Sequence, residues 1–339
     1  MSLLTCFLIS CSTEFGSVFS NQEDQSTYSQ ETQYWSNSNS LINQSQLAEN
    51  TIEFSHLAKD ETALQKIALP TNNEEVVYAF KNQGVFVCNL EELCLKLNFS
   101  LSKIDGILFD FDRKLLTGYY LKELEVLDLF NNKVIDRVAL RENISTVTYS
   151  FKEPSLYMGT LTGNVYKLYY LAKSQKEVNY NKLTRYTGHS SVIRNIVVHP
   201  TDRVFFSSDS QGILSSWLTF DAKPFDFKKE ENIFEPNFWS DKTNRMIAKL
   251  VSPTTEMLIR ADGKYLLLAL KNGAIEIWAV RGFKKVCSID LYKSNIKSVQ
   301  ANKDWSKIYT IGRDGKEHHF NLSPLYINEE VCNSYNGNI

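Results

Sequence analysis

The sequence predicts an all-β fold assembled from repeated small antiparallel sheets, and three observations support it. Short stretches in which apolar and polar residues alternate run from about residue 51 to residue 322, as expected for half-buried strands. Tight turns separate them, with glycine at positions 84, 163, 212, 273 and 315. These glycines differ by 79, 49, 61 and 42 residues, and the first interval has room for two repeats. Because a repeat of roughly 40 to 45 residues is typical of a propeller blade, the predicted fold is a closed β-propeller of four-stranded blades.

The amino-terminal copies of this unit are the weakest. They pair residues 76–80 with 85–88 around Gly84, residues 115–120 with 124–129, and residues 156–160 with 165–169 around Gly163. Each pair has the pattern of two strands joined by a short polar turn.

The clearest copy opens with Gly188 and His189, continues through a strand at residues 204–208, and ends at Trp217. Later copies end at Trp278 and Phe320, each five residues after its turn glycine, as Trp217 is. The unit resembles a WD repeat, in which a Gly-His opening and a terminal Trp-Asp frame the same strand order. The resemblance implies a propeller that binds other proteins.

Six copies are visible, so we expect six blades. The step of 61 residues between the glycines at 212 and 273 requires an insertion, which residues 221–249 supply. About twenty surplus residues are too few for four strands, so we expect a long loop, and a decayed seventh blade is the alternative. The aromatic residues of this insertion either contact a partner or pin the loop to the propeller. They are Phe225, Phe227, Phe234, Phe238 and Trp239.

Ring closure is expected through the two ends of a domain at residues 51–325. The last copy shows only its three inner strands, and residues 51–54 stand unpaired before the first copy. We expect residues 51–54 to complete the last blade, because this join removes two free sheet edges. The tail at residues 326–339 is expected to be loose.

His189 is the residue that most invites a catalytic interpretation. The resemblance to WD repeats implies instead a hydrogen-bonded network of this histidine with a strand hydroxyl, a turn aspartate and the blade tryptophan. Ser207 or Ser208 and Trp217 would take two of these parts, with Gln211 in place of the aspartate. Buried polar groups are mostly paired within the fold, so we predict a structural role and no catalytic residue.

Residues 1–20 resemble the export signal of a bacterial lipoprotein. Their apolar run ends at residues 8–11 in Leu-Ile-Ser-Cys, which is similar to a lipobox and implies that Cys11 receives a lipid. No Lys or Arg precedes the run, so either translation starts upstream or the match is accidental and this end is a frayed apolar terminus. Residues 21–50 are rich in Ser, Asn and Gln without an apolar period, which predicts a disordered tether. The resemblance favours the outer membrane, because Ser12 rather than aspartate follows the cysteine.

The remaining cysteines form no metal-binding pattern, because no CxxC and no zinc-finger spacing with histidine occurs. Buried, apolar cysteines are the expectation. Cys88 and Cys94 lie in adjacent predicted strands, so a bridge between them is the alternative for an exported domain.

Composition and motifs limit the function. A net charge of −2 with a pI near 6.3 gives no general attraction for phosphates, so no nucleic-acid ligand is expected. The sequence contains no GxSxG, HExxH, GxGxxG or phosphate-binding glycine loop, so we predict no enzyme, cofactor, metal or small-molecule substrate.

We therefore predict a non-catalytic platform for protein partners of unknown identity. It belongs to the cell envelope if Cys11 is acylated, and is a cytoplasmic scaffold if the lipobox match is accidental. Residues 127–135 resemble the blades of quinoprotein-like outer-membrane assembly lipoproteins, which makes an envelope assembly factor the alternative.

Overall fold

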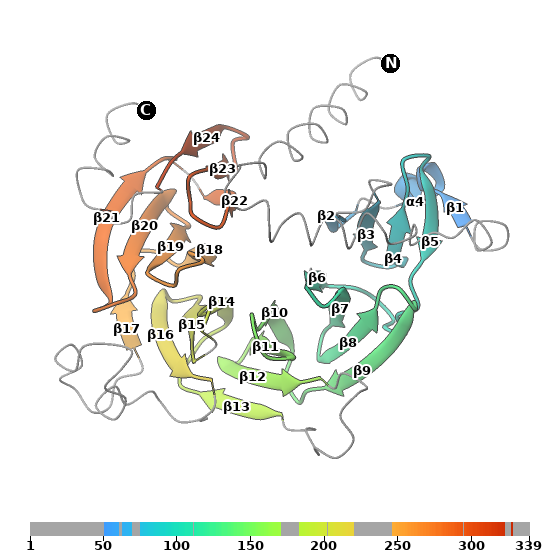
Figure 1. Ribbon diagram of the computed structural model, residues 1–339, viewed down its shortest axis with the longest axis horizontal. Coiled ribbons are helices and arrows are strands. Elements are labelled where there is room, and N and C mark those ends of the chain that lie inside the picture. Colours follow the sequence, from blue (N-terminus) through green and yellow to red (C-terminus); the bar gives the residue numbers. More distant parts are fainter. Residues whose placement is uncertain are drawn as a thin grey trace. The chain divides into compact units, whose positions relative to one another are not determined.

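The computed structural model describes residues 51–60, 63–69, 75–110, 112–170, 183–201, 203–219, 246–293, 295–322 and 327. The fold is the all-β, six-bladed propeller that the repeat predicts, with mostly four-stranded antiparallel blades. The chain divides into two compact units, Met1–Ala139 and Leu140–Ile339. Unit 1 contains two of the six sheets and unit 2 contains four, each seen as a small twisted sheet in Figure 1.

Unit 1 contains a five-stranded and a four-stranded sheet. The first has the order β1-β5-β4-β3-β2, and its strands are β1 (Thr51–Glu53), β2 (Gln65–Ala68), β3 (Val76–Phe80), β4 (Gly84–Cys88) and β5 (Leu93–Lys96). A short helix, α4 (Phe54–Asp60), follows β1. The second sheet has the order β6-β7-β8-β9, with β6 (Gly106–Asp110), β7 (Leu115–Tyr120), β8 (Glu123–Asp128) and β9 (Lys133–Ala139).

Unit 2 contains four sheets in which each strand pairs with the next along the chain. The first is β10 (Ile144–Tyr149), β11 (Ser155–Thr160), β12 (Asn164–Tyr169) and β13 (Thr184–Thr187), and the second is β14 (Ile193–Val198), β15 (Val204–Asp209), β16 (Ile213–Leu218) and β17 (Met246–Lys249). The third is β18 (Thr254–Ile259), β19 (Tyr265–Leu270), β20 (Ala274–Ala279) and β21 (Lys284–Asp290). The last has three strands in the described residues: β22 (Ile296–Ala301), β23 (Ile308–Gly312) and β24 (Glu317–Phe320). The first strand of each sheet lies on the inner side of unit 2 in Figure 1.

The apolar core lies between consecutive sheets. Successive side chains of a strand point to opposite faces, so Phe205 and Phe206 of β15 face different neighbours. Phe205 packs with Tyr157 of the preceding sheet at a ring distance of 4.8 Å, and Phe206 packs with Phe283 of the following sheet at 5.4 Å. β15 is therefore buried on both faces, as are β11 and β19, in which every residue is buried.

The expectation that residues 51–54 complete the last blade is wrong. Residues 51–53 form β1 and pair antiparallel with β5, placing Ile52 opposite Cys94. Phe54 begins α4, and the buried Leu57 of this helix packs with Phe80 and Phe86. The outer edge of β5 is only roughly 40 residues away along the chain, so pairing there closes a much shorter loop than pairing with the last blade would. Pairing with β1 also covers the free edge of β5, which would otherwise expose unpaired backbone groups.

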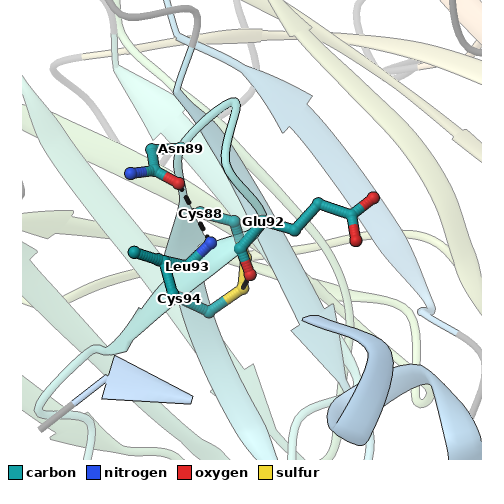
Figure 2. Close-up of a disulfide and its surroundings, with 5 residues drawn as sticks. All are labelled: Cys88, Asn89, Glu92, Leu93 and Cys94. Carbon is teal, nitrogen blue, oxygen red and sulfur yellow. Dashed lines mark hydrogen bonds between the residues drawn. A yellow bond between two sulfur atoms is a disulfide. The ribbon is translucent and has the colours of Figure 1, made fainter. Parts of the chain in front are cut away.

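A disulfide joins Cys88 of β4 to Cys94 of β5, where buried free cysteines were the expectation. The two residues are direct register partners, and their Cα atoms lie 4.0 Å apart. Figure 2 shows the disulfide and the turn beside it. The turn between them is closed by Asn89, whose Oδ1 accepts a hydrogen bond from the Leu93 backbone at 2.9 Å. The hairpin register thus brings together two cysteines whose spacing alone did not establish a bridge.

The ends of two predicted irregular segments are ordered. The last four residues of the predicted insertion, Met246–Lys249, form β17 and are the outer strand of their sheet. Ile327, in the tail expected to be loose, is buried with Leu322 and Trp305, and its backbone N–H donates to Tyr265 Oη at 3.1 Å. The predicted signal and tether at residues 1–50 lie outside the described residues, as do residues 220–245 of the insertion region.

Candidate functional site

At one end of each of the four sheets of unit 2, the turn between the second and third strands lies against the segment that leads into the first strand. In each sheet, the turn between the second and third strands donates a backbone hydrogen bond to the segment that leads into the first strand. These bonds are Leu161 N to Asn143 O, Ser210 N to Val192 O, Lys271 N to Pro253 O and Arg313 N to Asn295 O, at 2.8 to 3.0 Å. We call this the connection end of unit 2.

The second sheet of unit 2 carries a buried polar network at this end. Trp217 Nε1 donates to Ser207 Oγ at 2.7 Å, and Ser207 Oγ lies 2.7 Å from His189 Nε2. His189 Nδ1 lies 3.0 Å from Asp209 Oδ2, and neither of these two side chains is exposed to solvent. The structure therefore brings together His189, Ser207 and Trp217, the three residues that the sequence assigned to a structural network.

One arrangement of protons satisfies every member of this hydrogen-bond chain with a neutral histidine ring. The indole N–H of Trp217 donates to the Ser207 hydroxyl, which in turn donates its own proton to His189 Nε2. The histidine proton then sits on Nδ1 and is donated to the Asp209 carboxylate. Burial lowers the pKa of His189, and the bonded Asp209 offsets only part of this effect. The ring is neutral and both of its nitrogens are occupied, so the site holds the blade together and offers no base to a substrate.

The expectation that Gln211 replaces the acidic member of the network is wrong, because Asp209 fills that place. Besides the histidine bond, Asp209 Oδ1 accepts hydrogen bonds from the backbone N–H groups of Gln211 and Ile213, both at 2.9 Å. The signal was present in the sequence, since an aspartate three residues before a glycine is typical of a tight turn. The aspartate was overlooked because it is the last residue of a strand rather than part of the turn itself.

A second polar cluster at the connection end was not predicted. Glu142 accepts hydrogen bonds from Asn164 Nδ2 at 2.7 Å, from Tyr166 Oη at 2.9 Å and from Thr160 Oγ1 at 3.0 Å, and it also bonds Thr162 and pairs with Arg185. Burial disfavours its charged form, but the side-chain hydrogen bonds outweigh burial and lower the pKa of Glu142 to about 2. Glu142 lies outside any strand and its donors are spread over β11, β12 and β13, so no sequence motif marks the cluster.

Polar side chains also join the inner strands of neighbouring sheets. In unit 1, Gln65 Oε1 of β2 accepts a hydrogen bond from Ile107 N of β6 at 2.5 Å. In unit 2, Ser145 donates to Ile193 O at 2.7 Å and Asn195 donates to Thr255 O at 3.2 Å.

A further hydrogen bond between two inner strands is made by a titratable side chain, that of Glu256. Glu256 Oε2 of β18 accepts a hydrogen bond from Val299 N of β22 at 2.5 Å, whereas the three inner-strand bonds named above use neutral amides or a hydroxyl. Burial raises the pKa of Glu256 to about 7, and the bond from Val299 offsets only part of this effect.

The other predicted site residues lie outside the described part of the chain. These are the lipidation candidate Cys11 and the candidate partner contacts Phe225, Phe227, Phe234, Phe238 and Trp239. Within the described ranges, no group of three or more His, Cys, Asp or Glu side chains is arranged to hold a metal ion. No helix among the described residues is both long and apolar enough to span a membrane.

Comparison with known proteins identifies the fold and not a family. No family model matches the chain, and no curated protein matches it. The C-terminal WD40 domain of Sif2 superposes with a TM-score of 0.57 at 13% identity, over 78% of this chain and 68% of the matched chain. The fold of this chain is therefore similar to that of this WD40 domain.

Two further solved structures agree with this fold. The computationally designed Ika8 protein matches with a TM-score of 0.56 at 14% identity, over 75% of this chain and 69% of its own. A chain of the Mitotic Checkpoint Complex matches with a TM-score of 0.55 at 12% identity, over 77% of this chain and 80% of its own. At these identities the likeness concerns the fold alone.

Proposed function

We propose that this chain is a non-catalytic platform for protein partners, located in the bacterial cell envelope and held at a membrane by a lipid on Cys11. The observation that carries the platform role is the closed network around His189 within a propeller. The residues of this network that could perform chemistry are saturated by internal hydrogen bonds, with no ring nitrogen left for a substrate.

The fold supports a binding role. Propellers expose turns from every blade at each end, and such turns on a rigid scaffold commonly carry binding residues. One structural neighbour is a chain of the Mitotic Checkpoint Complex, and this supports a role in assembly.

The cysteine chemistry supports an oxidising compartment. Cys88 and Cys94 are bridged, and Cys287 is also disulfide-bonded. Disulfides persist in the periplasm and outside cells and are rare in the cytosol. The bridges therefore favour an exported platform over a cytoplasmic WD-repeat scaffold. The bridges are also compatible with the alternative role as an outer-membrane assembly factor, but they do not favour it over other exported platforms.

Photo-crosslinking in living cells tests the platform role. A photoreactive amino acid is placed singly at exposed positions at the connection end, Leu161 and Val251, and at the opposite end of unit 2, Phe151 and Lys303. We expect at least one position to yield a discrete adduct with another protein, since partner contacts fall on exposed turns. A folded protein that forms no adduct from either end would contradict the proposal.

Metabolic labelling tests the anchor. The chain should incorporate a fatty-acid analogue, and Cys11→Ser should abolish the label and release the protein from the membrane fraction, because the thiol is the acceptor of the lipid. Cys6→Ser, which changes a neighbouring cysteine, is the matched control and should keep the label. Labelling that survives Cys11→Ser would refute this anchor.

A further inference from the structure

The two units carry opposite charge. Residues 140–339 contain 27 Lys and Arg against 20 Asp and Glu, whereas residues 1–139 contain 10 against 19. The net charge of the whole chain is near zero because the positive net charge of unit 2 offsets the negative net charge of unit 1. A net charge of one sign attracts partners of the other.

At the connection end of unit 2, two carboxylates are directed inward. Glu142 is surrounded by the hydroxyl, amide and guanidinium donors described above, and Asp209 is buried against His189. Glu256, the one carboxylate on the four inner strands, binds the Val299 backbone. These three charges are therefore largely unavailable to neutralise nearby cations.

Four cationic side chains at the connection end are not paired with a carboxylate in the part of the chain that the structure describes. Arg141, Arg194, Lys293 and Lys297 are exposed, and none makes an ion pair within the described part of the chain. Arg194 and Lys297 are the second residues of β14 and β22, each at a register shift of its inner strand. A bulge of this kind redirects a side chain, and both positions lie near the start of the strand, at the connection end. Arg141 and Lys293 lie on the segments that lead into β10 and β22.

Apolar side chains accompany these cations. Leu161, in the turn between β11 and β12, is 47% exposed, and Val251, after β17, is 77% exposed. The turn of the last sheet is mixed in sign, since the exposed Asp314 and Glu317 lie beside Arg313 and Lys316. The excess of unpaired positive charge is therefore centred on the inner strands and their leading segments.

We propose that the connection end of unit 2 docks a segment of a partner protein in which acidic and apolar residues alternate. The inference rests on the proposed platform role and specifies its surface and the chemistry of its partner. Unpaired cations on a rigid surface attract carboxylates and favour the correct register, while exposed Leu161 and Val251 gain from apolar contact. A duplex nucleic acid would present phosphates but little apolar surface to these side chains, so a protein segment fits better.

The test measures binding of a fluorescein-labelled peptide of alternating Glu and Leu residues to the full-length chain. The double variant Arg194→Glu and Lys297→Glu should weaken binding by about tenfold or more, and raising the salt concentration should weaken binding to the wild type. The control, Lys303→Glu with Lys307→Glu, makes the same charge change in the turn between β22 and β23, at the opposite end, and should leave binding unchanged. A peptide with Gln in place of Glu should bind weakly to all three proteins.

Two outcomes of the binding measurements would overturn the inference. One is equal weakening by both double variants, which would mean attraction to net charge without a site. The other is tighter, Arg194-dependent binding to phosphatidylglycerol vesicles or duplex DNA than to the peptide, which would assign the surface to lipid or nucleic acid. Adducts obtained in cells only from Phe151 or Lys303 would also contradict this surface while leaving the platform role intact.

Discussion

Replacing Trp217 by alanine is expected to lower the free energy of unfolding by about 3 to 5 kcal/mol, as for other large-to-small substitutions in a packed core. The indole is 1% exposed, and its ring stacks on Phe205 at a centroid distance of 5.9 Å. The substitution also removes the donor to Ser207. Thermal or urea denaturation followed by circular dichroism measures the loss.

Trp278→Ala is the matched control for Trp217→Ala. Trp278 occupies the corresponding place in the next sheet but is only half-buried, and its indole donates to Glu276 at 2.9 Å. We expect a clearly smaller loss of stability there, because less apolar surface is removed from the core.

His189→Ala tests the network from its other end. It should cost about 1 to 3 kcal/mol, because Ser207 and Asp209 would be left with unmet hydrogen bonds in a buried site. A variant that keeps its melting temperature but loses partner binding would show that His189 is a binding residue and would refute the structural role.

Glu256→Gln is expected to remove a pH dependence of stability. The folded pKa of Glu256 is about 7, above the ordinary value of 4.5 that applies to the unfolded chain. The folded state therefore binds the proton more tightly, and stability from this group is fully present below pH 4.5 and is lost as the pH rises through 7. By linkage the loss approaches about 3 kcal/mol above pH 8. The amide oxygen of the substituted side chain would keep an acceptor for Val299 N, as Gln65 does for Ile107 in unit 1.

The measurement is the free energy of unfolding of both proteins between pH 4 and pH 9. His189 titrates in the opposite sense, since its lowered pKa removes stability as the pH falls, but it is common to both proteins and cancels in their difference. We expect the variant to be more stable than the wild type at pH 8 and the two to converge near pH 4. Parallel curves across the whole range would show that Glu256 does not titrate near neutral pH.

The repeat itself could be predicted because it is a local pattern. Alternating apolar residues, turn glycines and terminal aromatics recur in each copy, and strand pairing between neighbours along the chain requires only short turns. The strand pairs 115–120 with 124–129 and 156–160 with 165–169 agree with the observed sheets to within a residue. His189, Ser207 and Trp217 could be placed together for the same reason, since one repeat unit contains all three.

The features that were missed or left open depend on strand pairing and burial that the repeat pattern does not specify. The pairing of β1 with β5 was misassigned because an edge strand can add to any free edge, and the sequence does not indicate which edge is nearest. The Cys88–Cys94 bridge needed the hairpin register, and the raised pKa of Glu256 needed burial against the next sheet. None of these has a signature in the spacing of residues.

By itself the sequence determined the class of fold, the number of blades and the members of one buried network, because each follows from the periodicity of strands and turns within about 40 residues. The tertiary structure decided which edge the amino-terminal strand covers, which acidic residue completes the network, and which charges remain unpaired at the connection end of unit 2. The physical reason is that burial and hydrogen bonding are properties of neighbours in space. Residues as distant along the chain as Glu256 and Val299 become neighbours only when separate sheets pack together.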